Sequence, residues 1–267
     1  MSYTPKMFDY RGLQDMMFVA LYCVAAFAAL LAAAYLLWRR GNAFMREKGL
    51  ENIVTINSPR GPVRFYDPVR SSLRLRRWTA AFMAAIAASH VWWYAVGQWW
   101  LQDDWLVRTI LVIMLDYAVL VPLVMGVLLA MLQDHRRAWW PWIVAQLPVV
   151  AFAVTGIARR DMFFGYELGN YWQIAVCAAF IVYYIRALRQ YGRWLRDNFA
   201  DLEHKEVWQS LVFAVGLFLV YLVYTSNAGD LMREYLSQVI TLIIIVFLVW
   251  RVETLQELPS EEDMKDL

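Results

Sequence analysis

The chain has 267 residues, of which 61% are hydrophobic, and its mean hydropathy is +0.42. Soluble globular domains contain roughly half apolar residues, so the composition argues against a soluble protein and favours a membrane protein. The formal net charge is only +2 and the two cysteines, Cys23 and Cys177, lie inside apolar runs, so neither a strongly charged partner nor a disulfide framework is indicated.

Seven near-continuous apolar runs approach or reach the length of about 17–25 residues that a helix needs to cross a bilayer. In lipid each run must be helical, because an unpaired backbone N–H or C=O group has no water to bond and costs several kcal/mol. The fifth run is the shortest, and it can span if its aromatic residues lie at the interfaces. The runs are Met16–Trp38, Thr79–Trp99, Leu106–Leu132, Trp140–Ile157, Tyr171–Ile185, Trp208–Thr225 and Tyr235–Trp250.

Lysine and arginine are distributed unevenly among the segments that flank these runs. The segments on one side carry 19 of the 25 basic residues, and those on the other side carry six. Because short cytoplasmic loops are enriched in lysine and arginine, we expect an all-α, seven-transmembrane-helix bundle (16–250) in a bacterial cytoplasmic (inner) membrane. Its N-terminal tail (1–15) would lie outside and its C-terminus in the cytoplasm. The predicted cytoplasmic segments are 39–78, 133–139, 186–207 and 251–267.

The first cytoplasmic loop contains "NIVTI" and "VRFY", two β-prone runs on either side of the turn-rich "NSPRGP". This pattern predicts a small hairpin beneath the bundle. The loop closes with the basic sequence "RSSLRLRR". That cluster is explained most simply as a determinant of topology, and binding of anionic lipid headgroups is the alternative.

His90 and Asp116 are the ionisable residues inside the predicted spans that matter most, because such groups are costly in a membrane and mark functional sites by default. At about 1.5 Å of rise per residue, both lie roughly 13–15 Å below the outer surface, on antiparallel neighbours. One hypothesis is therefore a His–Asp pair that senses protons or a polar ligand. Two alternatives stay open: a static interhelical hydrogen bond that only aids packing, and no contact between the two residues.

Motifs for catalysis, metal binding and cofactor attachment are missing from the sequence. It contains no H-E-x-x-H motif and no cluster of His, Cys and Asp with metal-ligand spacing. The last run, "YLSQVITLIIIVFLVW", has no lysine for a retinal linkage. His135 and His204 are lone residues beside charges, for which exposure to solvent is the simplest explanation. We therefore expect neither an enzyme nor a metal or cofactor site.

The stretch "RDNFADLEHKEVW" lies between the fifth and sixth spans and is densely charged. Apolar positions continue from the fifth run at steps of 3 and 4, which predicts an amphipathic helix that leaves the bilayer. A new helix capped by Asn198 is the alternative. The plainer interpretation of the charges is a solvated lead-in to span six. The signalling interpretation makes them a polar relay, formed by Asp197, Asp201, Glu203, His204, Lys205 and Trp208.

The last span also continues beyond the membrane. Leu248, Val252 and Leu255 keep a spacing of about 3.5 residues through "WRVETLQEL" before Pro259, which favours a short parallel coiled coil between two copies and hence a homodimer. The predicted exit helix is represented by Trp250, Arg251, Val252 and Leu255, and an acidic tail without a core of its own follows it. A helix of this kind favours a cytoplasmic output partner.

Three stretches, "RWLRDNFADLEHKEVWQSL", "WRVETLQEL" and "GLENIVTINSPRGPVRFYDPVR", resemble the multi-span membrane region of Bacteroidota signalling proteins. In that family a membrane sensor precedes an AraC-type helix-turn-helix or a histidine kinase domain. The resemblance covers most of the chain and is strongest from 190 to 258. It implies an output domain, but the sequence contains no recognition helix and no kinase motif. We therefore expect either a fragment or an output on a separate polypeptide, and no direct nucleic-acid binding.

The sequence thus favours a membrane sensor that relays a stimulus to a cytoplasmic output domain or partner. A transporter or lipid-handling protein that uses the central polar groups is the second hypothesis. A helix-binding assembly factor is the third.

Overall fold

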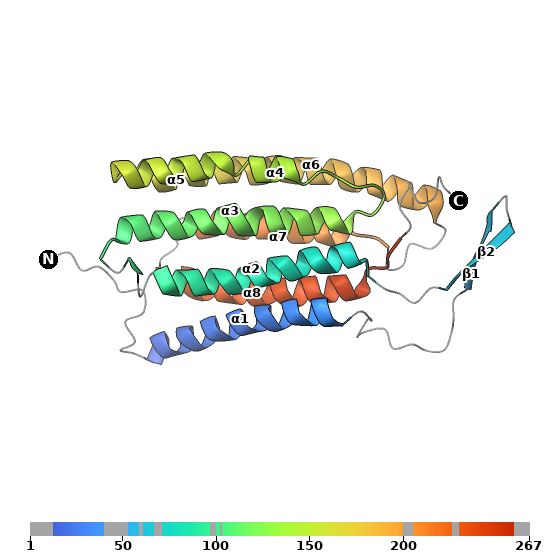
Figure 1. Ribbon diagram of the computed structural model, residues 1–267, viewed down its shortest axis with the longest axis horizontal. Helices are drawn as coiled ribbons and strands as arrows, with labels where there is room; N and C mark the ends of the chain where they lie inside the picture. Colours follow the sequence, from blue (N-terminus) through green and yellow to red (C-terminus); the bar gives the residue numbers. More distant parts are fainter. Residues whose placement is uncertain are drawn as a thin grey trace.

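The computed structural model describes residues 13–39, 53–58, 61–66, 71–96, 100–101, 103–199, 205–225 and 230–258. Long helices run side by side along one axis (Figure 1). Within the described residues they form seven rods, because α4 and α5 follow each other in one rod and the π-helical turn η2 leads into α6. The helices are α1 (Leu13–Trp38), α2 (Leu73–Ala95), α3 (Trp105–Met131), α4 (Trp140–Val144), α5 (Leu147–Arg159), η2 (Phe163–Glu167), α6 (Leu168–Asn198), α7 (Trp208–Thr225) and α8 (Asp230–Thr254).

Five of these rods are long and apolar enough to cross a membrane by length and composition, so the chain is a multi-pass membrane protein. They are Met16–Trp38, Trp105–Met131, Trp140–Arg159, Phe163–Asn198 and Tyr235–Thr254. The other two predicted spans coincide with α2, which begins with the charged "LRLRR", and with α7, whose apolar part, Trp208–Leu222, is shorter. Both lie within the same bundle as the five longer rods (Figure 1).

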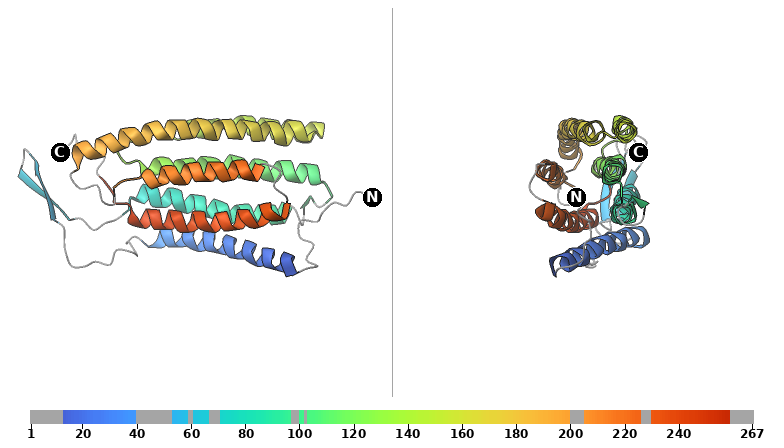
Figure 2. Two further views of the ribbon diagram at one scale, coloured as in Figure 1. Left: turned by 180° about the vertical axis from the view of Figure 1, so that it is seen from behind. Right: turned by 90° about the vertical axis from the view of Figure 1, so that its left-hand side faces the viewer.

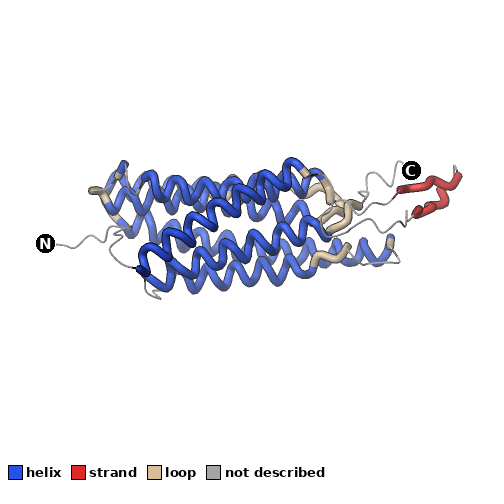
Figure 3. The backbone as a smooth tube through the Cα atoms, turned by 90° about the horizontal axis from the view of Figure 1, so that it is seen from below, coloured by secondary structure: helices blue, strands red, loops and turns tan. Residues whose placement is uncertain are grey.

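The predicted hairpin is present next to one end of the bundle. Strand β1 (Ile53–Ser58) pairs with β2 (Gly61–Tyr66) in antiparallel register, with Ile53 opposite Tyr66 and Ser58 opposite Gly61. The two strands lie beyond the helices, near the end at which α8 finishes (Figures 1 and 3).

α2 lies at the centre of one side of the bundle, where it packs on α1, α3 and α8, as the end-on view in Figure 2 shows. On the other side α6 packs on α5 and α7, and α5 packs on α3. α1 and α2 share the largest helix interface and both bury small residues, which lets their backbones approach closely. The buried alanines are Ala25, Ala29, Ala32 and Ala33 of α1 and Ala80 and Ala85 of α2.

A second close approach joins α5 to η2 through two glycines. A Cβ atom placed on Gly156 would lie 2.2 Å from the Cα atom of Gly165. Neither backbone can move far, because Asp161 after α5 is bonded to the Gly156 carbonyl and Gly165 N–H donates to the Asp161 carbonyl. The absence of a side chain at Gly156 is therefore a condition for this contact.

We expect Gly156→Ala to destabilise the protein by about 2 kcal/mol or more, because overpacking usually costs about 1–3 kcal/mol and here the clash is with backbone. Thermal unfolding in detergent, followed by loss of monodisperse protein, measures the effect. Gly192→Ala is the matched control, since a Cβ atom at Gly192 meets nothing within 4 Å. Equal melting temperatures for the two variants would contradict the close packing.

Candidate functional site

Asp116 of α3 faces α2 and accepts three hydrogen bonds from it. Ser89 Oγ donates to Oδ1 at 2.6 Å, Trp92 Nε1 donates to the same oxygen at 3.1 Å, and Trp93 Nε1 donates to Oδ2 at 2.7 Å. The three donors can converge on one carboxylate because residues three and four positions apart share one face of a helix. Hydroxyl and indole groups thus solvate Asp116 in a part of the bundle where water would otherwise be needed.

His90, the residue after Ser89, makes a separate set of contacts. Its Nδ1 lies 2.8 Å from the carbonyl oxygen of Ile86, and its Nε2 lies 2.9 Å from Oε1 of Gln238 on α8. The hydroxyl of Tyr22 on α1 donates to the His90 carbonyl, and the two rings have centroids 4.5 Å apart. His90 therefore joins α2 to α8 and α1.

The structure places His90 and Asp116 in the same region of the bundle, but their side chains do not hydrogen-bond to each other. Asp116 ties α2 to α3, whereas His90 ties α2 to α8. Each of the two residues therefore forms an interhelical hydrogen bond, but its partner is not the other member of the predicted His–Asp pair. A sensing role for either residue stays a prediction.

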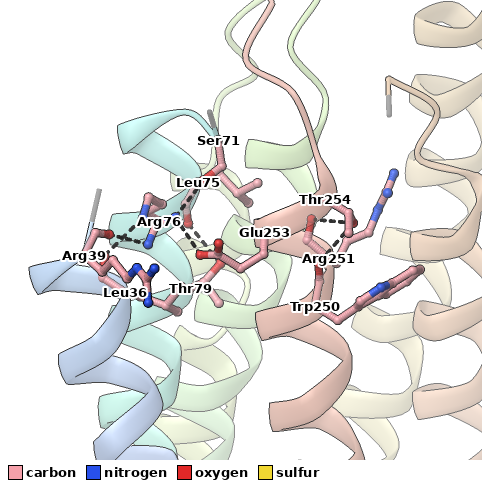
Figure 4. Close-up of polar contacts among 10 residues, drawn as sticks. All are labelled: Leu36, Arg39, Ser71, Leu75, Arg76, Thr79, Trp250, Arg251, Glu253 and Thr254. Atoms are coloured by element: carbon pink, nitrogen blue, oxygen red, sulfur yellow. Dashed lines mark hydrogen bonds and ion pairs between the residues drawn. The ribbon is translucent and has the colours of Figure 1, made fainter. Parts of the chain in front are cut away.

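At the opposite end of the bundle, Arg76 of α2 forms a buried ion pair with Glu253 of α8 (Figure 4). Arg76 Nη1 lies 2.8 Å from Glu253 Oε1, and the two side chains are 3% and 0% exposed. The same guanidinium donates to Ser71 Oγ at 3.0 Å, to the Leu36 carbonyl at 3.3 Å and to the Arg39 carbonyl. We call these five residues the Arg76–Glu253 cluster.

In the Arg76–Glu253 cluster, the Arg76 side chain of α2 contacts both the end of α1 and α8. The last carbonyl groups of a helix have no partner within the helix, and Arg76 supplies donors to two such groups at the end of α1 while its charge is neutralised on α8. Sequence reasoning missed this contact, because Arg76 was counted only as one of the basic residues of "RSSLRLRR". A signal was present: Arg76 shares a helix face with Thr79 and Met83, and both are fully buried.

The segment that follows α8 is held under the bundle. Gln133, just after α3, donates from Nε2 to the Gln256 carbonyl at 2.9 Å and accepts from the Leu258 N–H at 2.8 Å. Arg251 donates to the carbonyl of Glu206, which lies just before α7. These contacts connect the exit from α8 both to α3 and to the lead-in of α7.

The prediction that Leu248, Val252 and Leu255 form a coiled-coil seam with a second copy is wrong, because these residues pack within their own chain. Leu248, Val252 and Leu255 are fully buried within this chain, and α8 ends at Thr254. The same spacing that packs two helices of a coiled coil also packs a helix into its own bundle, so periodicity alone did not separate the two. Of the other exit residues, Arg251 is buried and Trp250 is 41% exposed.

The charged stretch before α7 is described only in part, since Asp201, Glu203 and His204 lie outside the described residues. Asp197 is exposed in the last turn of α6, and Trp208 is 55% exposed at the start of α7. The Lys205 carbonyl accepts a hydrogen bond from Tyr191 at 3.0 Å, and its ammonium lies 5.8 Å from the centroid of the Phe199 ring.

The amphipathic extension of the fifth span is confirmed as far as Asn198, because α6 is continuous to that residue. The alternative, in which Asn198 caps a new helix, is wrong: Asn198 is the last residue of α6, and its side-chain amide donates to the Trp194 carbonyl at 2.8 Å.

A second group of charges lies where α3 is joined to α4. Arg137 makes a two-point contact with Asp134 at 2.5 and 2.8 Å, and both are buried. His135 Nδ1 lies 3.0 Å from Asp134 Oδ2, one of the two oxygens that Arg137 contacts. Burial, together with the positive charges of Arg136 and Arg137, lowers the pKa of the nearby Arg74 guanidinium. This end of the bundle therefore crowds several cations around few carboxylates.

A cavity of about 250 Å³ lies between α3, α6 and α7. Its walls are mostly apolar. The polar residues among its lining are Asp116, Tyr117, Gln173 and Tyr221. Tyr221 donates to the Tyr117 hydroxyl at 3.0 Å, and Tyr117 donates to Asn170 Oδ1 at 3.0 Å. Within the described residues, no group of three or more His, Cys, Asp or Glu side chains could hold a metal ion.

We expect Arg76→Met to destabilise the protein by about 3–5 kcal/mol, because it leaves Glu253 buried without a counter-charge. The double variant Arg76→Met/Glu253→Leu should lose much less than the two single changes together. Unfolding in mixed micelles measures all three. Arg77→Met removes the neighbouring, exposed arginine and should change stability little. Additive losses in the double variant would mean that the two charges do not interact.

Comparison of the chain with protein-family models, with curated proteins and with solved structures finds no match in any of the three. The resemblance to Bacteroidota signalling proteins is therefore an expectation that rests on the quoted stretches alone.

Proposed function

We propose that this protein is a sensor module of the bacterial cytoplasmic membrane that relays a stimulus to a cytoplasmic output domain or partner. The observation that carries the proposal is a double connection between α2 and α8. His90 bonds to Gln238 in one half of the bundle, and Arg76 pairs with Glu253 at the other end.

The two connections are spaced alike on the two helices. Arg76 and His90 are 14 positions apart on α2, and Gln238 and Glu253 are 15 positions apart on α8. At about 1.5 Å per residue, these separations are about 21 and 22 Å, so the antiparallel helices meet at both points without distortion. A displacement of α2 at His90 is therefore carried to the end of α8.

The input in this proposal is a change at Asp116. All three donors to its carboxylate belong to α2 and flank His90 in the sequence. A ligand or proton that alters Asp116 thus acts first on α2, next to its bond to α8. A relay also requires two conformations whose balance shifts by a few kcal/mol.

The output in this proposal is the segment that ends near Leu258. It contacts the stretch before α7, which the signalling interpretation treats as a relay, through the bond from Arg251 to the Glu206 carbonyl. Because Val252 and Leu255 are buried in their own chain, a homodimer would form through another surface.

The proposed topology places the Arg76–Glu253 cluster on the cytoplasmic side and the N-terminus outside. Its support is that the ends of α1, α3 and α8, the start of α2 and the segment before α7 come together at one end of the bundle. These are the parts that the distribution of lysine and arginine assigns to the cytoplasm.

Single-cysteine variants test this topology in a background with Cys23 and Cys177 replaced by alanine. Glu257→Cys should react with a membrane-impermeant maleimide only after the cells are opened, whereas Asp103→Cys should react in intact spheroplasts. Both positions are exposed in the structure, so a lack of reaction cannot be ascribed to burial. The reverse pattern would reject the orientation.

The relay is tested with an environment-sensitive fluorophore on Glu257→Cys of the purified protein in nanodiscs. Asp116→Asn should change the emission of the label, because it weakens the bonds that position α2. Asp103→Asn is the matched control, an identical chemical change at an exposed position. Adding Arg76→Met/Glu253→Leu should remove the response. An unchanged emission in a folded Asp116→Asn variant would mean that the bundle is static.

A carrier or lipid-handling protein is the second candidate, and the cavity beside Asp116 favours it. Uptake of a solute into liposomes by the purified protein, lost in Asp116→Asn, would support this function in place of signalling.

A further inference from the structure

The cavity between α3, α6 and α7 is polarised along its length. At one end it is lined by Asp116, Tyr117, Gln173 and Tyr221, and at the other by residues such as Leu128 and Ala214. Tyr117 and Leu128 are 11 positions apart on α3, which corresponds to about 17 Å. A molecule that fills this space has a polar group at one end and an apolar body at the other.

The size of the cavity exceeds that of an ordinary packing defect. Its volume of about 250 Å³ is larger than the roughly 150 Å³ of an apolar protein cavity that takes up benzene.

Gln173 supplies an independent indication of a ligand. Its side chain is fully buried, and its amide oxygen has no hydrogen-bond partner among the described residues. Its amide nitrogen makes only a weak bond to the Cys177 sulfur at 3.5 Å. A buried acceptor without a partner costs about 1–3 kcal/mol. A bound molecule with a donor group would offset that cost.

The depth of this polar end restricts the chemistry of the ligand. Asp116 and Tyr117 lie about 11 or 12 residues into α3 from Trp105, or about 17 Å from the end of the helix. A phosphate headgroup brought to this depth would be desolvated beside the Asp116 carboxylate with no cation among the residues that line the cavity, and the Asp116 oxygens already accept three hydrogen bonds from α2. A single hydroxyl group can be buried there with one good acceptor.

We infer that this cavity binds a neutral amphiphile, whose long apolar body lies along α3 and whose single hydroxyl group donates a hydrogen bond to Gln173. The class includes long-chain and isoprenoid alcohols. The inference concerns binding alone and holds whether or not the protein relays a signal.

Equilibrium binding of radiolabelled farnesol, a linear isoprenoid alcohol, to the full chain in phospholipid nanodiscs tests this site. We expect saturable binding with one site per chain. Gln173→Leu should weaken it about tenfold, which corresponds to the loss of one hydrogen bond. Farnesene, which has the same carbon chain without the hydroxyl, should compete about tenfold less well in the unaltered protein and should compete as well as farnesol in Gln173→Leu.

Gln146→Leu is the matched control, because Gln146 is also a buried glutamine whose side chain has no hydrogen-bond partner among the described residues, but it does not line this cavity. It should leave farnesol affinity unchanged. Thermal stability is measured in parallel: Gln173→Leu should keep or raise it, since the change removes an unsatisfied polar group, so a loss of binding cannot be ascribed to unfolding. Non-saturable farnesol uptake, or equal affinity for farnesol in the unaltered protein and in Gln173→Leu, would overturn the assignment.

Discussion

The pairing of Arg76 with Glu253 is the interaction on which the cytoplasmic end of this bundle depends in the proposed topology. Both side chains are almost wholly buried, and removing two charges from water costs several kcal/mol per ion, even in proteins that relax around them. The cost is offset because every donor direction of the guanidinium that the structure describes meets an oxygen: a carboxylate, a hydroxyl and two carbonyls at the end of α1. Such a pair contributes more to the choice of one arrangement than to stability, since few other arrangements of α1, α2 and α8 would satisfy both charges.

The other polar centre of the bundle solves the same physical problem differently. Within the part of the chain that the structure describes, Asp116 is bonded to no cation and is surrounded instead by a serine hydroxyl and two indole N–H groups. Neutral donors spread the charge over several weaker contacts, so the carboxylate is held without a single dominant partner. An environment of that kind changes with the protonation or ligation of one group more readily than an ion pair does, and this difference is why the proposed input lies at Asp116 and the fixed point at Arg76.

Sequence reasoning recovered the elements but not the contacts between distant segments. Apolar runs predicted all seven rods, and the turn-rich "NSPRGP" predicted the hairpin, because these features depend on neighbouring residues. It also selected His90 and Asp116, because ionisable residues in apolar runs are rare. It did not find Glu253 or Gln238, since their partners lie more than a hundred residues earlier in the chain. Spacing showed that Val252 and Leu255 were buried, yet could not tell a second copy from the rest of the same chain. The cavity had no signature in any single segment, because three helices form it together.

The contacts around the end of α8 differ in strength, and that difference sets how a relay through it would proceed. The pair between Glu253 and Arg76 involves two charges, and breaking it would leave both without compensation. The bonds from Gln133 to Gln256 and Leu258 are neutral and join single groups, so each contributes about 1 kcal/mol. A shift of α2 would therefore move α8 with it as one body, and the bonds to Gln133 would break first. The chain just beyond Thr254, where the helix has already ended, is then the part whose position relative to α3 changes. In the proposed relay, the signal would leave the bundle as a shift of residues 255–258 relative to Gln133, with α2 and α8 still joined.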